Sequence, residues 1–168
     1  AYGDRPVERE KLEAVLRAGN QAPIFGRLHM SVFAGPEQLQ AVDAAAVAGM
    51  ARSGVPFLEN LAAQEGYHPL YGAAALVVLS APGGLDEKGF NMANVSCAAE
   101  NMLLAAAGLG LGSCFLMGPM AAFSDPALRA RLELPGGYEP LVGVALGYAA
   151  LERPVAPERT DAGITWCR

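Results

Sequence analysis

Residues 94–119, NVSCAAENMLLAAAGLGLGSCFLMGP, constrain the fold of this chain more than any other segment. Nearly every position from Met102 to Leu111 is apolar, which predicts a helix that lies inside the protein or inside an oligomer. The glycines of GLGLG then allow a sharp turn and the close approach of another backbone or a flat ligand. A short buried strand, SCFLM, is predicted directly after this turn.

The position of these glycines argues against a dinucleotide-binding Rossmann fold. In that fingerprint the glycines follow a strand and precede a helix, so that the phosphates meet a helix N-terminus. Here they follow a helix and precede a strand.

The composition indicates a single domain that associates with a second copy. The chain has 168 residues, the length of one domain, and is 52% hydrophobic and 17% charged. This is apolar for its size, so either the core is generous or a large face is buried against a second copy, and we favour the second. The net charge of −5 argues against a nucleic-acid partner and against an anionic membrane surface. No apolar run reaches the roughly 18 residues that a membrane span requires.

The cysteines and the N-terminal residues bear on the cellular compartment. The segment AYGDRPVEREK contains no apolar core of a signal peptide. Cys97, Cys114 and Cys167 show no spacing typical of a metal site. We expect Cys97 and Cys114 to be small core residues, and Cys167 to be partly exposed. The odd number of cysteines and the absent signal predict the cytoplasm.

Short helices and strands are predicted along the rest of the chain. Helices should begin near Pro6, Pro36 and Pro126, because proline fits the first turn of a helix. A further short helix is expected within residues 55–66, and residues 20–30 look irregular. Strands are predicted at residues 30–34, 73–80, 113–117 and 140–148. Helices that cover a four-stranded sheet indicate the α+β or the α/β class.

Two of these strands have features of their own. Residues 73–80 form a continuous apolar run, typical of a strand covered on both faces. Gly143 and Gly147 share one face of the last strand, which predicts close contact with a flat group or another backbone.

The chain is poor in groups that perform acid–base chemistry. His29 lies beside Arg27 in the irregular segment, and His68 precedes the second strand, without the spacing of a metal site. Ser113 lacks the frame of a hydrolase nucleophile, and no paired carboxylates suggest glycosidase chemistry. Such a chain can still be an enzyme if a cofactor carries the reaction.

Four blocks in order, PVEREKLEAVLRAGNQAP, HPLYGAAALVVLSAP, AAENMLLAAAGLGLGSCFLMG and LELPGGYEPLVGVALGY, resemble the FMN-dependent nitroreductase family over nearly the whole chain. The third block is the most specific, at Asn101, Leu104, Ala105 and residues 110–113. The resemblance implies an α+β fold with a central mixed sheet flanked by helices. It also implies one domain over residues 1–168, with a C-terminal tail from about residue 150 docked on the partner subunit.

The resemblance further implies an intertwined homodimer with two FMN molecules at its interface, each contacted by both chains. The implied activity is hydride transfer from NADH or NADPH to FMN, and then to a nitroaromatic, a quinone or a similar small-molecule acceptor. Two alternatives remain open. One is a non-catalytic scaffold that binds flavin or another flat ligand, and the other is a specialised member that acts on one substrate.

The resemblance assigns the flavin ring to the strand after the glycine turn. The matching residues are Phe115, Leu116, Met117 and Gly118. They would supply an apolar slot and backbone donors for the ring. Many relatives carry an acidic residue at the position of Met117, but the backbone N–H makes the bond. The alternative is that Leu116 and Met117 are only core residues.

A loop near the N-terminus matches a second flavin contact of the family, with departures. Pro23, Ile24, Phe25, Arg27 and His29 lie in the matching stretch. Ile24 replaces a hydroxyl residue, Arg27 replaces Asn and His29 replaces Gln. Arg27 and His29 either donate hydrogen bonds to the pyrimidine edge or ribityl chain, or are ordinary loop residues.

The FMN phosphate needs a cation, and a bidentate arginine suits it. Arg159 is the best match in the tail and Arg153 a poorer one, with a solvated charge as the alternative. The family's Arg-x-x-Arg segment would stand just before Ala1, and Arg5 comes too late to replace it. Either the sequence given lacks this stretch, or part of the phosphate site has been lost.

Overall fold

The computed structural model describes residues 1–83, 89–150, 163 and 165–167 of the chain. The helices in this part are α1 (Arg9–Asn20), α2 (Pro36–Met50), α3 (Pro56–Ala62), α4 (Phe90–Gly108), the 3-10 helix η1 (Gly118–Ser124) and α5 (Pro126–Ala130). The strands are β1 (His29–Phe33), β2 (Ala75–Pro82), β3 (Gly112–Leu116) and β4 (Tyr138–Gly147). None of the described helices is long and apolar enough to cross a membrane.

The four strands form one sheet in the order β1-β2-β4-β3. All three pairs of neighbours run antiparallel. The expectation of a mixed sheet is therefore wrong for the described strands. Since strand direction alternates across the whole sheet, a parallel pair would require a further strand from outside these four. Helices and an antiparallel sheet confirm the α+β class.

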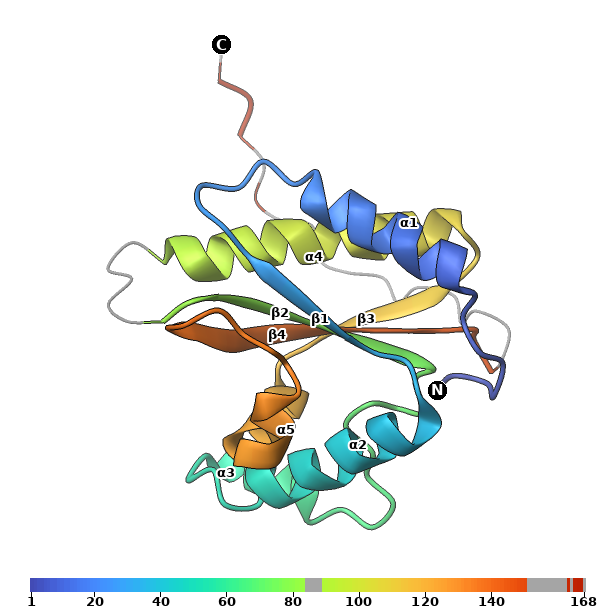
Figure 1. Ribbon diagram of the computed structural model, residues 1–168, viewed down its shortest axis with the longest axis vertical. Coiled ribbons are helices and arrows are strands. Elements are labelled where there is room, and N and C mark those ends of the chain that lie inside the picture. The colour runs from blue at the N-terminus through green and yellow to red at the C-terminus, as the bar shows by residue number, and fades with distance from the viewer. Residues whose placement is uncertain (84–88, 151–162, 164, 168) are drawn as a thin grey trace.

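Helices cover both faces of the sheet (Figure 1). Helices α1 and α4 lie on one face, whereas α2, α3, α5 and η1 lie on the other. Side chains of β2 alternate between the two layers: Ala75, Val77 and Leu79 join the α1–α4 core, and Leu76 and Val78 join the opposite core. The prediction that this apolar run forms a strand covered on both faces is confirmed.

The glycines of β4 allow close contacts on one face of that strand. A Cβ on Gly147 would lie 2.7 Å from Cδ1 of Tyr2, so the predicted flat group at this position is the Tyr2 ring. A Cβ on Gly143 would lie 3.0 Å from Cδ1 of Leu76. Burial raises the pKa of Tyr2 well above its ordinary value. The N-terminal residues are thereby fixed to the end of β4, where Tyr2 also forms a β-bridge with Ala149.

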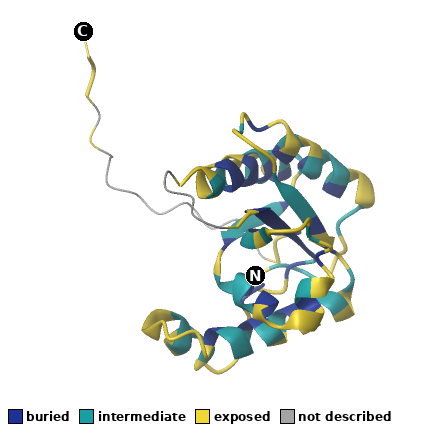
Figure 2. Ribbon diagram, turned by 60° about the vertical axis from the view of Figure 1, so that its left-hand side comes forward, coloured by how far each residue is buried: buried dark blue, intermediate teal, exposed yellow. Residues whose placement is uncertain are grey.

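Helix α4 is buried on one side only. Val95, Ala98 and Met102 are fully buried, whereas Leu104 is 63% exposed, and Figure 2 shows this division along the helix. The expectation that Cys97 is a core residue is wrong for the single chain, because Cys97 is on the exposed side. An apolar composition around the whole helix gives no signal for which side faces the sheet.

The other two cysteines differ in exposure. Cys114 on β3 is half-buried, so its prediction as a core residue is only partly correct. Cys167 is exposed, and residues 165–167 lie apart from the helices and the sheet (Figures 1 and 2).

A polar network connects α1 to the end of β4. The Tyr148 hydroxyl donates to Glu8 Oε2 at 2.6 Å, and Lys11 Nζ donates to the Tyr148 hydroxyl and to the Leu109 carbonyl, each at 2.9 Å. Arg5 pairs with Glu8 at 2.6 Å, and its guanidinium lies 4.0 Å from the Tyr148 ring centroid. The Tyr148 hydrogen bond, the Glu8 backbone and Arg5 lower the pKa of Glu8 to about 2.

This network predicts a change in acid sensitivity on Tyr148→Phe. A carboxyl whose pKa is lowered by folding stabilises the protein above its unfolded pKa, and this stabilisation is lost as pH falls through the folded pKa. Without the hydroxyl, the pKa of Glu8 should rise. The variant should therefore be less stable than wild type near pH 7, and the difference should shrink between about pH 5 and pH 2. Urea unfolding of both proteins across this pH range measures the difference in their free energies of unfolding.

Tyr138→Phe is the matched control, because the Tyr138 hydroxyl has no hydrogen-bond partner among the described residues. A stability difference between wild type and Tyr148→Phe that stays constant with pH would contradict the role assigned to Glu8.

Candidate functional site

The loop before β1 is fastened to α4 by a side-chain amide. The Phe25 backbone N–H donates to Asn94 Oδ1 at 3.0 Å, and Asn94 Nδ2 donates to the Phe25 carbonyl at 2.6 Å. Asn94 is buried, at 7% exposure. The sequence analysis missed this residue, because its partner lies 69 positions away and no local pattern links the two.

This loop presents an aromatic ring and a free cation to solvent. Phe25 is 80% exposed, and Pro23 and Arg27 are exposed as well. Ile24 is partly buried and packs against the α1–α4 core. Within the described part of the chain, Arg27 makes no hydrogen bond or ion pair. Arg27 is therefore available to an anionic or carbonyl group of a ligand.

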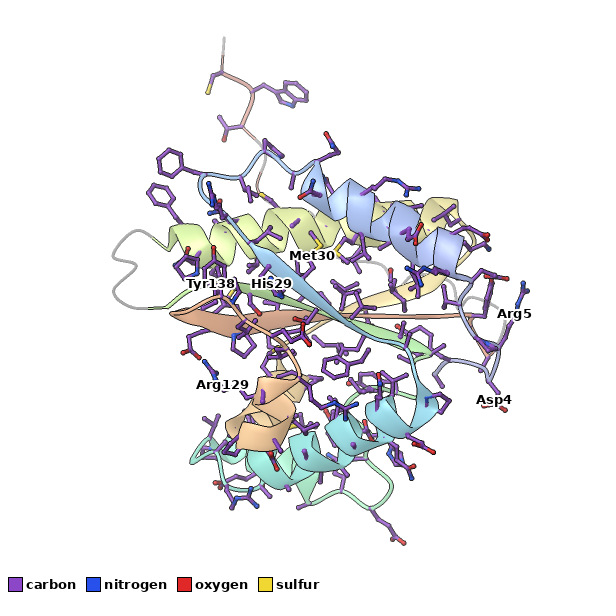
Figure 3. The ribbon with its side chains drawn as sticks, in the orientation of Figure 1. Asp4, Arg5, His29, Met30, Arg129 and Tyr138 are labelled. Atoms are coloured by element: carbon purple, nitrogen blue, oxygen red, sulfur yellow. The ribbon has the colours of Figure 1, made fainter. Side chains whose placement is uncertain are left out.

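His29 is more constrained than a loop residue. It is the first residue of β1, where Figure 3 labels it beside Met30. Its Nε2 lies 3.2 Å from the Leu132 carbonyl, which also accepts from Ser31 Oγ at 2.7 Å. With Nε2 donating to this carbonyl, only Nδ1 remains to contact a ligand.

The second predicted contact lies at the end of β3. Leu116 is buried in the core on the α2 side, and Phe115 packs against the opposite core. Met117 is 56% exposed, so it is a surface residue and not a core residue. Gly118 begins η1. No described residue accepts a hydrogen bond from the backbone N–H of Met117 or Gly118, and both groups are available as donors.

One chain does not bring these two groups of residues together. β1, which follows the loop at residues 23–28, and β3 are opposite edges of the sheet. Three interstrand spacings of about 4.8 Å separate them, or about 14 Å in total. The two groups of residues therefore lie at opposite edges of the sheet within one chain.

Two of the described arginines are already engaged by other residues of the chain. Arg5 is engaged by Glu8 and Tyr148, and Figure 3 shows it far from Tyr138 and Arg129. Arg129 pairs with Glu139 at 2.8 Å. The predicted phosphate ligands Arg159 and Arg153 lie outside the described residues.

A large cavity of about 940 Å³ lies between α2, residues 64–74 and the N-terminal residues. The described residues lining it include the carboxylates Asp4, Asp43 and Glu65 and no lysine or arginine. This charge disfavours a phosphate group. In this cavity, His68 Nδ1 lies 2.7 Å from Asp43 Oδ2. The pKa of Tyr67 is raised to about 12, mainly because the side chain is partly buried. In the part of the chain described, no cluster of His, Cys, Asp or Glu could hold a metal ion.

The comparison with known families agrees with this geometry. A sequence model of the nitroreductase family matches residues 1–148. The chain belongs to the nitroreductase family. The expected family and the nitroreductase-like fold are thus confirmed.

Solved structures resemble this nitroreductase family member along nearly its whole length. A nitroreductase with bound FMN from Bacteroides fragilis is 29% identical, with a TM-score of 0.84, over 100% of this chain and 92% of that chain. A nitroreductase with bound FMN from Desulfitobacterium hafniense has a TM-score of 0.85 at 23% identity, over 99% and 91% of the chains. An FMN-dependent nitroreductase from Clostridium difficile has a TM-score of 0.79 at 17% identity, over 98% and 91%. The last two support the fold alone.

Proposed function

We propose that this nitroreductase family member is an FMN-dependent oxidoreductase that transfers hydride from NAD(P)H to a nitroaromatic, quinone or similar acceptor. The observation that carries the proposal is the end of β3, where an apolar strand is followed by the backbone N–H groups of Met117 and Gly118, which have no acceptor among the described residues. Backbone donors beside an apolar slot suit the polar edge of an isoalloxazine ring. The 29% identical Bacteroides fragilis relative was crystallised with FMN.

The residues present fit FMN as a ligand. Phe115 and Leu116 would support the ring, while Met117 and Gly118 donate to its polar edge. Pro23, Ile24, Phe25, Arg27 and His29 would approach from another chain, with Arg27 as a cation near the reduced ring. Arg159 would bind the phosphate.

FMN, when bound, supplies the hydride transfer, so we assign no catalytic acid or base to the chain. The protein's residues hold the ring, fix its orientation and exclude water.

The assembly we propose is a homodimer with a flavin site at each of two equivalent interfaces. Support comes from the separation of about 14 Å, or three interstrand spacings, between the two residue groups within one chain. Exposed apolar side chains give further support: Leu104 is 63% exposed, Val32 on β1 is 41% exposed and Trp166 is 86% exposed. The tail around Trp166 would dock on the partner. Light scattering should give a mass near twice 17.4 kDa.

The free cysteines Cys97, Cys114 and Cys167 support a cytoplasmic location.

The visible absorption spectrum tests the proposed function directly. Purified protein mixed with FMN and then desalted should keep a flavin band, which NADH should bleach and 1,4-benzoquinone should restore. Protein that remains colourless at micromolar FMN would contradict the proposal.

A non-catalytic flavin-binding protein is the second candidate. It is motivated by the departures at Ile24, Arg27 and His29 from the family pattern of the loop. Arg5, which pairs with Glu8 and lies over the Tyr148 ring, is already engaged within the chain. Flavin that binds and is not reduced by NADH or NADPH would support this candidate over the enzyme.

Arg27→Gln should weaken FMN binding about tenfold, because a charge-assisted hydrogen bond is replaced by a neutral one. Quenching of flavin fluorescence during titration measures the dissociation constant. Arg52→Gln removes an exposed arginine just beyond the end of α2 and should leave the constant unchanged. If wild type and Arg27→Gln bind FMN with equal affinity, Arg27 does not contact the cofactor.

A further inference from the structure

Two aromatic rings form an exposed pair beside the loop that we assign to the flavin. The ring centroids of Phe25 and Phe90 lie 5.8 Å apart, with the ring planes tilted by 47°. Phe25 is 80% exposed and Phe90 is 44% exposed. Phenylalanine rings usually remove their apolar surface from water, so a pair this exposed has a surface suited to another apolar group.

Helix α4 fixes the backbone positions from which both rings project. Phe90 is the first residue of α4, and Gly89 before it has the left-handed φ of 67°. Asn94 lies four residues further along, on the same side of the helix, and it binds both backbone polar groups of Phe25 at 3.0 Å and 2.6 Å. The same helix turn therefore sets the position of Phe90 and of Phe25. A prearranged surface loses less conformational entropy when a ligand binds.

The chemistry of the pair indicates what it binds. Aromatic faces favour flat rings in offset or tilted arrangements. Arg27 is two positions from Phe25 in the same loop and has no partner among the described residues, so it can attract the oxygens of a nitro or quinone group.

We propose that Phe25 and Phe90 form an aromatic wall that binds the ring of the electron acceptor and selects aromatic and quinonoid acceptors over non-aromatic ones. The inference rests on the proposed function, which brings the loop at residues 23–28 to the flavin of the partner chain. It goes beyond that function by assigning acceptor selection to these two side chains.

The experiment compares two acceptors in FMN-loaded full-length protein. Phe25→Leu and Phe90→Leu keep an apolar side chain of similar volume and remove the ring. Each should raise the KM for 1,4-benzoquinone about threefold to tenfold, and the double variant further, with kcat changed less. The rate of Phe90→Leu with ferricyanide, which has no ring to stack, should stay within about twofold. Phe25→Tyr keeps an aromatic ring and should therefore have the wild-type KM for 1,4-benzoquinone.

A measurement without turnover accompanies the kinetics. Binding of 4-hydroxybenzamide, a flat ring that the enzyme does not reduce, should perturb the absorption of the oxidised flavin. Its dissociation constant should rise in Phe25→Leu and Phe90→Leu. Phe57→Leu, which removes a ring that is 68% exposed on α3, is the matched control. It should change neither the KM for 1,4-benzoquinone nor the dissociation constant of 4-hydroxybenzamide.

The outcomes separate this inference from the proposed function. Wild-type protein that binds FMN and oxidises NADH, with variants that weaken both acceptors equally or neither, would overturn the aromatic wall alone. Leucine variants that change the dimer mass while acceptor discrimination stays constant would also overturn it, and would assign the rings to the subunit interface. A wild type without flavin or NADH oxidation would overturn both.

Discussion

Gly49→Ala is expected to destabilise the protein by about 2 kcal/mol or more and to weaken FMN binding. A Cβ on Gly49 would overlap the carbonyl oxygen of Ala121 and would lie 2.8 Å from its carbon, so α2 and η1 must move apart. Helix η1 begins at Gly118, beside the Met117 N–H that we assign to the flavin. Urea unfolding measures the loss of stability, and flavin fluorescence titration measures the loss of affinity.

Gly108→Ala is the control, and its expected change in the free energy of unfolding has the opposite sign. Gly108 is the last residue of α4, and no heavy atom lies within 4 Å of a Cβ placed there. Alanine is the better helix former by about 1 kcal/mol, so this variant should be equal to or more stable than wild type. A Gly49→Ala protein as stable as wild type would mean that α2 and η1 separate without loss of packing.

Asn94→Ala should lower the free energy of unfolding by about 1–3 kcal/mol and weaken FMN binding about tenfold or more. The substitution removes both hydrogen bonds to Phe25 and frees the loop that carries Arg27. A loop that must become ordered on binding costs conformational entropy, and this reduces affinity. Asn94→Asp keeps the acceptor for the Phe25 N–H but places a carboxylate oxygen against the Phe25 carbonyl, so it should also bind FMN weakly.

Asn101→Ala is the matched control on the same helix. Asn101 Nδ2 donates a single hydrogen bond of 3.2 Å to the Ala18 carbonyl of α1, away from the loop. Its loss should reduce stability modestly and leave FMN affinity unchanged. If Asn101→Ala and Asn94→Ala weaken FMN binding equally, α4 packing and not the loop anchor controls the site.

Local signals in the sequence predicted the elements of this fold well. The apolar run at residues 73–80 predicted β2, because a strand covered by helices on both faces has no polar side. The GLGLG turn predicted the change from α4 to β3, and Gly110 has the left-handed φ of 75° there. Helix η1 was not predicted, because Gly118 and Pro119 look like the start of a loop.

Contacts between distant residues could not be predicted from local patterns. The sheet order β1-β2-β4-β3 depends on pairing between distant strands. The Tyr2 ring on Gly147 and the Asn94 anchor of Phe25 each join positions far apart in sequence. Residue-level reasoning identified the apolar strand and the irregular loop. Their roles at a flavin came from the family resemblance and stay predictions, as does the assignment of Arg159.

The exposed Trp166 provides an optical signal built into the chain. It is the only tryptophan among 168 residues, and its side chain is 86% exposed. Light emitted by tryptophan therefore reports on the tail alone, because the core contains no other indole. Transfer of this indole from water to an apolar surface shifts its emission to shorter wavelength. The subunit association proposed above can thus be followed by the wavelength of tryptophan emission in unlabelled protein, independently of unfolding of the core.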